Sequence, residues 1–570
     1  LTATNVNLTA GTGSIYGANS TSNLLLSAGN LTANATTANQ NVYVSDTISG
    51  TVNVSGPSSA GGSFNLVATN GGSSAGGVLD IGSGNTISGG SVSLTTGTLT
   101  NNSSVTANTG NVAIQSNASS NGLTVNMASG SNLTASAGNV NFNGTNAGSV
   151  TIQPVSGVTP LGNISAAGNV NLNIGSGNAS VSANSVSGTV QDPNANLNSP
   201  TAGSVSISTA SGTLTFANLA ASSVAISNGN AITTNGTIVG SNGVTVTTPS
   251  LTNTGAIKVT AGSANLLVQN NGNISVTLGN GSTMTSQNGN VEFQNTTPGQ
   301  ASQINIVGQG GNPYGTISAN NAIILNAGSS SINVNINQLI GCVEPTASSV
   351  SITTQTGNLV FCAGVNTTSG TSGAINIVAN GGSINIGSTG GNSLTTSISG
   401  SGSTAGSITI NGATGVTISG NINAIGSSGA SGGAINISTT SGNISVTNVA
   451  STSTGGNGGS ITLNASNGTV NADDISTDSS GLGNTAGSLN VTGGNGITFT
   501  NITANGTTGA SGGSITLTST GQVITGNDIT AAATGGTGGN GGSVTTTSGA
   551  LILNGSNSSG NSIDAHSVAG

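Results

Sequence analysis

Ten acidic residues are the most numerous ionisable side chains in this chain of 570 residues, and most of them stand alone in sequence. Glycoside hydrolysis requires two facing carboxyl groups, and Ca²⁺ requires several oxygen ligands around one point. Only Asp473, Asp474 and Asp478 lie close together, with Asp528 further along. This group could bind a hard cation, but solvated turn residues would give the same pattern, so calcium binding stays open. We expect no enzymatic activity and no cofactor.

The two cysteines end similar phrases, Leu-Ile-Gly-Cys at Cys342 and Leu-Val-Phe-Cys at Cys362, which are 20 residues apart. If 20 residues make one turn of a stacked coil, the two Cα atoms lie about 5 Å apart, within the range that a disulfide allows. We predict a disulfide between them, with two buried free thiols as the alternative. The single histidine, His566, is far away in sequence, and a structural zinc site needs four ligands. We therefore expect no zinc site.

Positive charge is almost absent, because Lys258 is the only basic residue and the net charge is -9. A protein that binds nucleic acid neutralises a row of phosphates with several Lys and Arg side chains, and a single Lys cannot do this. No stretch reaches the roughly 18 to 20 consecutive apolar residues of a membrane helix. We expect no nucleic-acid partner and no membrane span, and we expect Lys258 to point into solvent.

Internal repeats organise the C-terminal part of the chain. The phrase Gly-Ser/Ala-apolar-x-apolar recurs at spacings near 27 residues, with its first apolar residue at Ile375, Ile408, Ile435, Ile461, Leu489, Ile515 and Val544. A second apolar site follows at Val416, Ile444, Val470, Ile497 and Val523, and a third at Ile422, Val449, Ile475, Ile502 and Ile529. Disordered polar tracts do not keep three apolar sites in register, so we expect a folded repeat protein.

Each apolar site alternates apolar and polar residues and is rich in β-branched side chains, as short strands are. The sequence therefore predicts an all-β, single-stranded parallel β-solenoid with three short strands per coil and about 20 to 30 residues per coil. Inward-facing residues of successive coils should form one core stack, namely Ile408, Ile435, Ile461, Leu489 and Ile515. Uncharged outward residues fit this fold, because stacked like charges would repel one another.

The N-terminal part is less regular. Its corresponding phrases occur at Val92, Val112, Val140, Val170 and Val205, with spacings between 20 and 35 residues. We expect one continuous rod with irregular coils over residues 1–340 and regular coils of about 27 residues over 341–570. Two Pro-containing stretches, residues 192–200 and 308–314, are expected to form loops outside the coils.

The units Gly-Gly-Ser-Ile461-Thr462-Leu463 and Gly-Gly-Ser-Ile515-Thr516-Leu517 resemble the repeats of filamentous-haemagglutinin-like and autotransporter-type bacterial surface proteins. The resemblance covers nearly the whole chain. It implies a secreted or surface-anchored protein whose β-helical rod serves adhesion or display, outside the cell or on its surface.

We therefore expect a non-catalytic structural rod of an extracellular fibre, sheath or adhesin. Residues 1–8 alternate like a strand and Leu551-Ile552-Leu553 reads as another, with no capping helix at either end, so we expect end-to-end stacking with itself or continuation into a longer chain. Two alternatives remain. A loop near Tyr314 could bind surface glycans, and Thr-x-Thr strands such as Thr245-Val246-Thr247 could bind ice.

Overall fold

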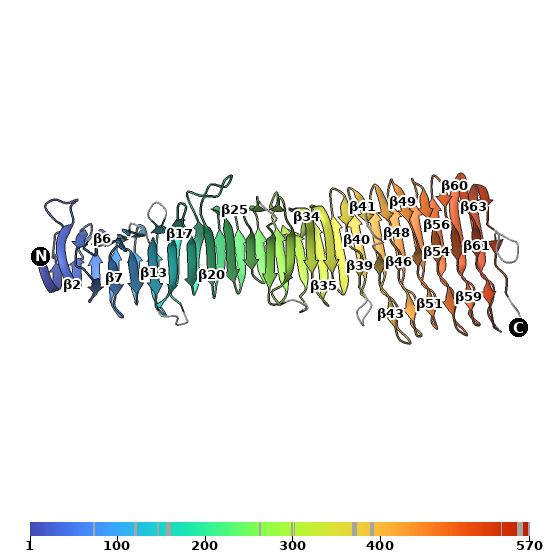
Figure 1. Cartoon of the computed structure of the whole chain (residues 1–570), viewed down its shortest axis with the longest axis horizontal. Helices are drawn as coiled ribbons and strands as arrows, with labels where there is room; N and C mark the ends of the chain where they lie inside the picture. Colours follow the sequence, from blue (N-terminus) through green and yellow to red (C-terminus); the bar gives the residue numbers. More distant parts are fainter. Residues whose placement is uncertain are drawn as a thin grey trace. The chain divides into compact units, whose positions relative to one another are not determined.

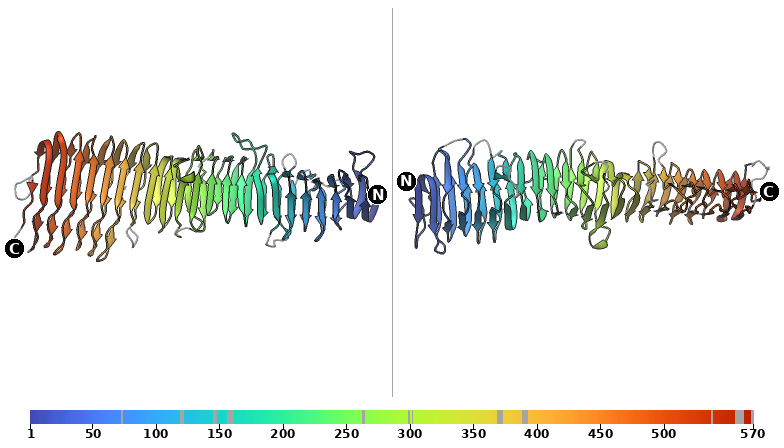
Figure 2. Two further views of the ribbon diagram at one scale, coloured as in Figure 1. Left: turned by 180° about the vertical axis from the view of Figure 1, so that it is seen from behind. Right: turned by 90° about the horizontal axis from the view of Figure 1, so that it is seen from below.

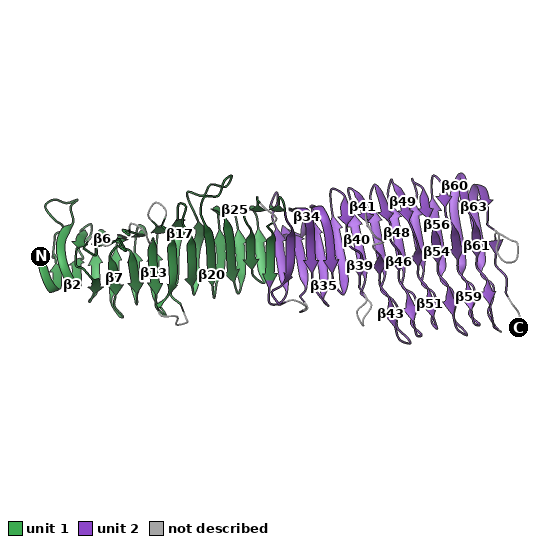
Figure 3. Ribbon diagram, viewed as in Figure 1, with its two compact units in different colours: residues 1–269, 283–288 green, residues 270–282, 289–570 purple. Residues whose placement is uncertain are grey.

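The computed structural model describes residues 1–71, 74–118, 122–144, 148–155, 161–261, 264–297, 300, 302–367, 373–387, 393–536, 538–555 and 563–567. Strands make up 58% of the structure, and no α-helix occurs in these ranges. The chain forms two compact units (Figure 3). Unit 1 comprises Leu1–Gln269 and Thr283–Asn288, and unit 2 comprises Asn270–Ser282 and Gly289–Gly570.

Unit 1 is a stack of coils in which each strand pairs in parallel with a strand of the next coil (Figure 1). A representative coil contains β20 (Ser204–Thr209), β21 (Thr213–Phe216) and β22 (Leu219–Ala221). These strands pair with the next coil, made of β23 (Ser223–Asn228), β24 (Ala231–Thr234) and β25 (Thr237–Gly240). The predicted parallel β-solenoid is therefore the fold, with three strands per coil here.

Four of the five valines that mark the corresponding phrases of unit 1 stack on one another, and the last does not. Val92, Val112, Val140 and Val170 pair in register in that order. Val170 then pairs with Val190, whereas Val205 pairs with Ala179 on a different face. The interval before Val205 contains an unpredicted strand, β19 (Ser185–Gln191), which lacks the Gly-Asn-Val phrase and so escaped notice.

Unit 2 is also a parallel solenoid, and its later coils have four strands. One coil contains β44 (Ile408–Gly412), β45 (Gly415–Ile418), β46 (Ile422–Asn423) and β47 (Gly426–Ser427). The fourth strand is only two residues long and was not predicted, because in most coils its inward residue is a glycine or serine rather than an apolar residue, as at Gly426, Ser453 and Ser479. These coils are broad in one view and thin in the perpendicular one (Figure 2).

The five core residues expected in unit 2 pair with one another in register and are at most 1% exposed: Ile408, Ile435, Ile461, Leu489 and Ile515. The third apolar sites pair just as regularly, from Ile422 to Ile529. The second sites follow the same order up to Ile497, where the last prediction fails. Ile497 pairs with Ile524, which is fully buried, whereas Val523 is 43% exposed.

The error at Val523 has a simple cause. The corner between the first and second strands contains one residue more in some coils than in others, and two apolar residues stand side by side at this point. Alternation alone cannot decide which of two adjacent apolar residues faces inward. Here the longer corner within β60 (Ser514–Gly526) turns Ile524 into the core.

A ladder of glycines precedes the first strand of each later coil in unit 2. A Cβ added to any of them would lie 1.8–2.3 Å from the carbonyl oxygen of the ladder glycine one coil earlier, so no other residue fits. The members are Gly406, Gly433, Gly459, Gly487, Gly513 and Gly542. Buried hydroxyl groups span the thin coil to reach this ladder, since Thr477 Oγ1 donates to the carbonyl of Gly487 (3.1 Å) and Ser451 Oγ donates to that of Gly433. The repeated Gly-Gly-Ser phrase therefore records close backbone contact between coils.

Both Pro-containing stretches form connections between strands, as expected, although Gly308 is still the last residue of a strand. Residues 192–200 form part of the connection between β19 and β20. Residues 309–315 connect β33 (Ile304–Gly308) to β34 (Thr316–Asn326) and include the 3-10 turn η2 (Gln309–Gly311).

Candidate binding surfaces

Cys342 and Cys362 form a disulfide bond, with their Cα atoms 5.6 Å apart. Cys342 lies on β36 (Gln338–Thr346), which pairs in parallel with β38 (Leu359–Phe361). In this register Cys342 faces Val360, not Cys362, so the bond runs diagonally to a position just beyond the end of β38. The two similar Leu-x-x-Cys phrases are therefore not aligned in the structure, although the bond that they suggested is present.

The disulfide lies on the surface of the coils. The adjacent residues Val343 and Phe361 are fully buried, and the alternation of the strand turns both cysteines outward. Cys342 is half-buried and Cys362 is exposed. The bond therefore links two successive coils from outside without taking up space in the core.

Two residues of the acidic group, Asp474 and Asp528, lie on the third strands β54 (Asp474–Ser476) and β61 (Asp528–Thr530), and Asp478 follows β54. Asp474, Asn501 and Asp528 pair in one outward column. Asp474 and Asp528 line a pocket together with Asp478, whereas the exposed Asp473 lies before its strand and does not line that pocket. Proximity in sequence therefore wrongly placed Asp473 in this group, whereas the more distant Asp528 does lie beside it.

Neutral hydrogen-bond donors occupy the carboxylates of Asp474 and Asp478, whereas the buried Oδ1 of Asp528 has no hydrogen-bond partner among the described residues. Asp474 Oδ1 accepts a bond from Asn501 Nδ2 (2.9 Å). The carboxylate of Asp478 accepts bonds from Ser476 Oγ (2.8 Å) and Thr503 Oγ1 (3.0 Å) and from the backbone N–H of Asn505. Within the described ranges no three His, Cys, Asp or Glu side chains converge as metal ligands would. The geometry assigns the carboxylates of Asp474 and Asp478 a role in holding neighbouring coils together.

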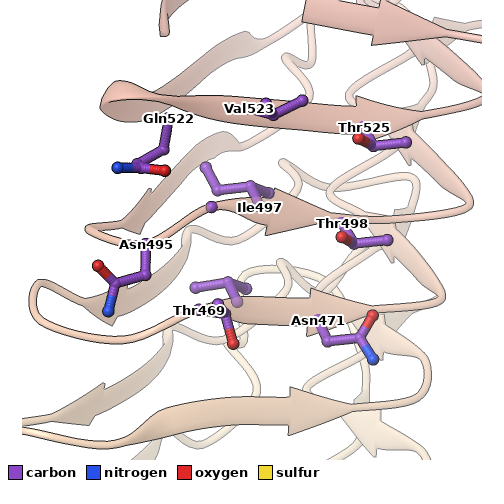
Figure 4. A pocket seen from close by; sticks show the side chains of 10 residues that line it. Thr469, Asn471, Asn495, Ile497, Thr498, Gln522, Val523 and Thr525 are labelled. Atoms are coloured by element: carbon purple, nitrogen blue, oxygen red, sulfur yellow. The ribbon is translucent and has the colours of Figure 1, made fainter. Parts of the chain in front are cut away.

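A shallow pocket of about 470 Å³ crosses three coils of unit 2 at the start of the second strand (Figure 4). Asn495 and Gln522 lie on one side of it, and Thr498 and Thr525 stack on the other. Ile497 forms part of its floor. We refer to it as the coil pocket. Its lining is neutral and follows the repeat, so it is a property of the coils themselves.

A second pocket, of about 430 Å³, lies in unit 2 beside the loop that contains Tyr314. Its polar side chains come from one corner of four successive coils, after β30 (Ile274–Leu278), β33, β35 (Ser331–Ile336) and β37 (Ser349–Thr354). The lining includes Asn280, Asn312, Pro313, Tyr314, Asn337 and Gln355, and we call it the Tyr314 pocket. No charged residue lines it.

Tyr314 is half-buried, not fully exposed as its place in a Pro/Gly loop suggested. Its backbone N–H donates to the carbonyl of Asn312 (2.8 Å), which closes a tight turn around Pro313. Tyr314 therefore lines the pocket from a backbone that this turn holds in place.

The Thr245-x-Thr247 pair lies on β26 (Val244–Thr247) and faces outward in unit 1. Its neighbours in register are Ala225 and Ser227 on one side and Leu267 and Gln269 on the other. The threonine pair is therefore not repeated on the adjacent coils, as a lattice that matches ice would require.

The remaining ionisable residues lie apart from both pockets. Lys258 is exposed on β28 (Ala256–Val259), as expected. His566 contacts the carboxylate of Asp564, and this hydrogen bond lowers the pKa of Asp564. Burial raises the pKa values of Asp80 and Asp192, against the smaller opposing effects of hydrogen bonds from Asn102 and Asn194.

Sequence reasoning missed the role of Asp46, which it treated as an isolated acid. Its side chain is fully buried, and its carboxylate accepts bonds from the backbone N–H groups of Ala28 (3.1 Å) and Ile48 (3.1 Å). The alternation of the strand could have indicated this role, because Val42, Val44 and Asp46 occupy alternate positions of β3 (Val42–Asp46) and all face inward.

Comparisons with protein-family models, characterised proteins and solved structures find no match to this chain. In the described ranges no helix is both long and apolar enough to cross a lipid bilayer. The geometry and surface chemistry of the coils are therefore the basis for any function proposed for this chain.

Proposed function

We propose that this chain is a non-catalytic structural solenoid of an extracellular bacterial fibre, sheath or surface adhesin. The observation that carries the proposal is the in-register stacking of neutral outward residues. On the first strands of unit 2 one outward column reads Thr409, Asn436, Thr462, Asn490, Thr516 and Thr545. Such a column can be extended coil after coil without charge repulsion.

The surface chemistry supports a long-lived material outside the cell. Charged residues make up 2% of the chain, so changes of salt and pH have few groups to act on. Trypsin-like proteases cut after Lys or Arg, and this chain offers only Lys258, which lies within a paired strand. The disulfide between Cys342 and Cys362 fits an oxidising compartment, and the Gly-Gly-Ser-Ile units resemble those of filamentous-haemagglutinin-like surface proteins.

Assembly is part of this proposal, because the last long strand leaves one edge open. On one side β63 (Ser543–Leu553) pairs with β60, and among the described residues no strand pairs with its other side. Leu551 is partly exposed, although its partner on the preceding coil, Ile524, is fully buried. An open core edge of this kind favours the addition of a further coil. That coil could come from the continuation of a longer chain or from a second copy of this one, and in the second case the head-to-tail contacts propagate into filaments.

Two variants at adjacent positions test this assembly. Leu551→Glu places a charge on the inward face of the open edge and should abolish filaments. Ile552→Glu places the same charge on the outward face, where Ile552 is already 47% exposed, and should leave them intact. Electron microscopy and light scattering across a dilution series give the readout. A wild-type chain that stays a 53.5 kDa monomer at every concentration would contradict assembly between copies, as would equal behaviour of the two variants.

A further inference from the structure

We infer that the Tyr314 pocket binds a neutral sugar, as the recognition site of a scaffold that is otherwise uniform along its coils. This inference adds a ligand to the chain and does not depend on filament formation. The pocket is a departure from the repeat, because the loop that forms one wall replaces what is elsewhere a short corner. Binding residues are often carried by loops on a rigid framework.

The loop is fixed at its base. Gly315 has a φ of 81°, and a Cβ added there would lie 2.4 Å from Cβ of Leu278, a fully buried core residue. The next residue, Thr316, donates its backbone N–H to the carbonyl of Ser282 (3.0 Å). Together with the tight turn at Pro313, these contacts hold the Tyr314 backbone in place before any ligand arrives, which lowers the entropy cost of binding.

The lining suits a sugar. Four residues with amide side chains line the cavity: Asn280 and Asn312 are exposed, and Asn337 and Gln355 are half-buried. Asn337 Oδ1 already accepts a bond from Thr356 Oγ1 (3.2 Å), so its NH₂ group is the part left for a ligand. Each amide carries both a donor and an acceptor, which is what the paired hydroxyl groups of a pyranose require. The Tyr314 ring offers an apolar face with a polar hydroxyl at its edge, against which the C–H face of a sugar can pack.

Charge and size narrow the ligand class. The absence of any charged side chain from the lining excludes a strong preference for sulfated or carboxylated sugars, which need a positive partner. The volume of about 430 Å³ lies within the range of about 300 to 1,000 Å³ that small-molecule sites occupy. We therefore expect a neutral terminal sugar or a short neutral oligosaccharide.

The coil pocket provides an internal comparison. It has nearly the same volume and a similar amide and hydroxyl lining, but no aromatic residue. If amides alone were sufficient, both pockets would bind sugars equally. The inference assigns binding to the pocket that combines them with Tyr314.

Saturation-transfer NMR on the purified full chain tests this with the methyl glycosides of glucose, galactose, mannose and N-acetylglucosamine, with sialyllactose as the charged comparison. We expect millimolar binding of at least one neutral glycoside and none of the sialic acid moiety. Tyr314→Ala should weaken binding about tenfold, which corresponds to the loss of roughly 1.4 kcal/mol of ring packing. Tyr314→Phe should retain most of it.

Two control variants keep the result interpretable. Tyr16→Ala removes a tyrosine that is 41% exposed in unit 1, and Asn495→Ala alters the coil pocket; both should bind like the wild type. Asn337→Ala should weaken binding without touching the loop. Circular dichroism of each variant checks that the coils are intact. The inference is overturned if none of the four neutral glycosides binds, or if Tyr314→Ala binds as well as Tyr16→Ala does.

Discussion

The two units use the same fold but differ in how regularly the contacts between coils recur. In unit 1 polar side chains at inward corners link one coil to the next, as when Thr234 Oγ1 donates to Asn253 Oδ1 (2.7 Å) and Asn228 Nδ2 donates to Thr209 Oγ1 (2.7 Å). These four side chains are buried. In the later coils of unit 2 a ladder of glycines that ends at Gly542 brings backbone against backbone once in every coil.

This difference explains why only unit 2 has a visible sequence repeat. A hydrogen bond between side chains can be made by several residue pairs, so the coils of unit 1 tolerate different lengths and different corner residues. Contact between glycine backbones admits one residue type and one geometry. Unit 1 also has close glycine contacts, since a Cβ on Gly255 would lie 1.9 Å from the carbonyl oxygen of Gly236, but they do not recur in every coil. The weaker repeat of unit 1 therefore does not indicate a different fold.

The strongest test of the shared core is a charge placed inside it. Ile461→Asp should destabilise unit 2 by about 4 kcal/mol, because Ile461 is fully buried and the narrow core has no partner for a carboxylate. Thr462→Asp is the matched control on the same strand, since its neighbours in register are Asn436 and Asn490, and it should change stability by less than about 0.5 kcal/mol. Denaturant unfolding followed by circular dichroism measures both, and equal midpoints would contradict the register.

A substitution in the glycine ladder should affect unit 2 nearly as strongly. Gly487→Ala would place a Cβ 1.8 Å from the carbonyl oxygen of Gly459, and because the nearest atoms all belong to the backbone, no side-chain movement can relieve the clash. We expect a loss of about 3 kcal/mol. Gly272→Ala, also in unit 2, meets its nearest atom at 3.6 Å and should be neutral or slightly stabilising. If both alanine variants unfold alike, the ladder does not set the spacing of the coils.

Alternation of apolar residues was sufficient to predict the solenoid and the five-residue core stack. It was not sufficient at Val205 or Val523, because the number of residues in a corner decides which face the next strand presents. Corner length depends on contacts with the preceding coil, which a local pattern does not contain. The two-residue strands such as β47 were missed for a related reason, since a buried glycine leaves no apolar signal.

The candidate site was predictable only in part. The Pro and Gly residues around Tyr314 indicated a loop, and the loop is present. The amides opposite it, Asn280, Asn337 and Gln355, come from corners of other coils and are separated from Tyr314 by more than 20 residues. Their convergence follows from the stacking register, so it became visible only in the structure.

The disulfide offers a smaller effect confined to unit 2. Replacing both Cys342 and Cys362 by Ser should lower stability by about 2 kcal/mol, near the lower end of the usual range because the bond spans only 20 residues. The core should not change, since both side chains face outward. Thermal unfolding with and without reductant gives the measurement. Reductant should lower the midpoint of the wild type to that of the double variant and should not affect the variant; an unchanged wild type would argue against the bond in solution.

The smallest predicted effect has opposite signs in the two units. Burial raises the pKa values of Asp80 and Asp192 above 3.8, so folded unit 1 binds protons more tightly than the unfolded chain, and its stability should rise as the pH falls from neutral through those raised values towards 3.8. The hydrogen bond from His566 lowers the pKa of Asp564, so the last coil of unit 2 should lose stability as the pH falls from 3.8 through that lowered value. Hydrogen exchange at a series of pH values separates the two regions. Asp192→Asn should reduce the gain in stability of unit 1 at low pH, and Asp564→Asn should remove the loss of stability in unit 2. A fall in the stability of unit 1 between neutral pH and 4 would show that burial does not control these carboxyl groups.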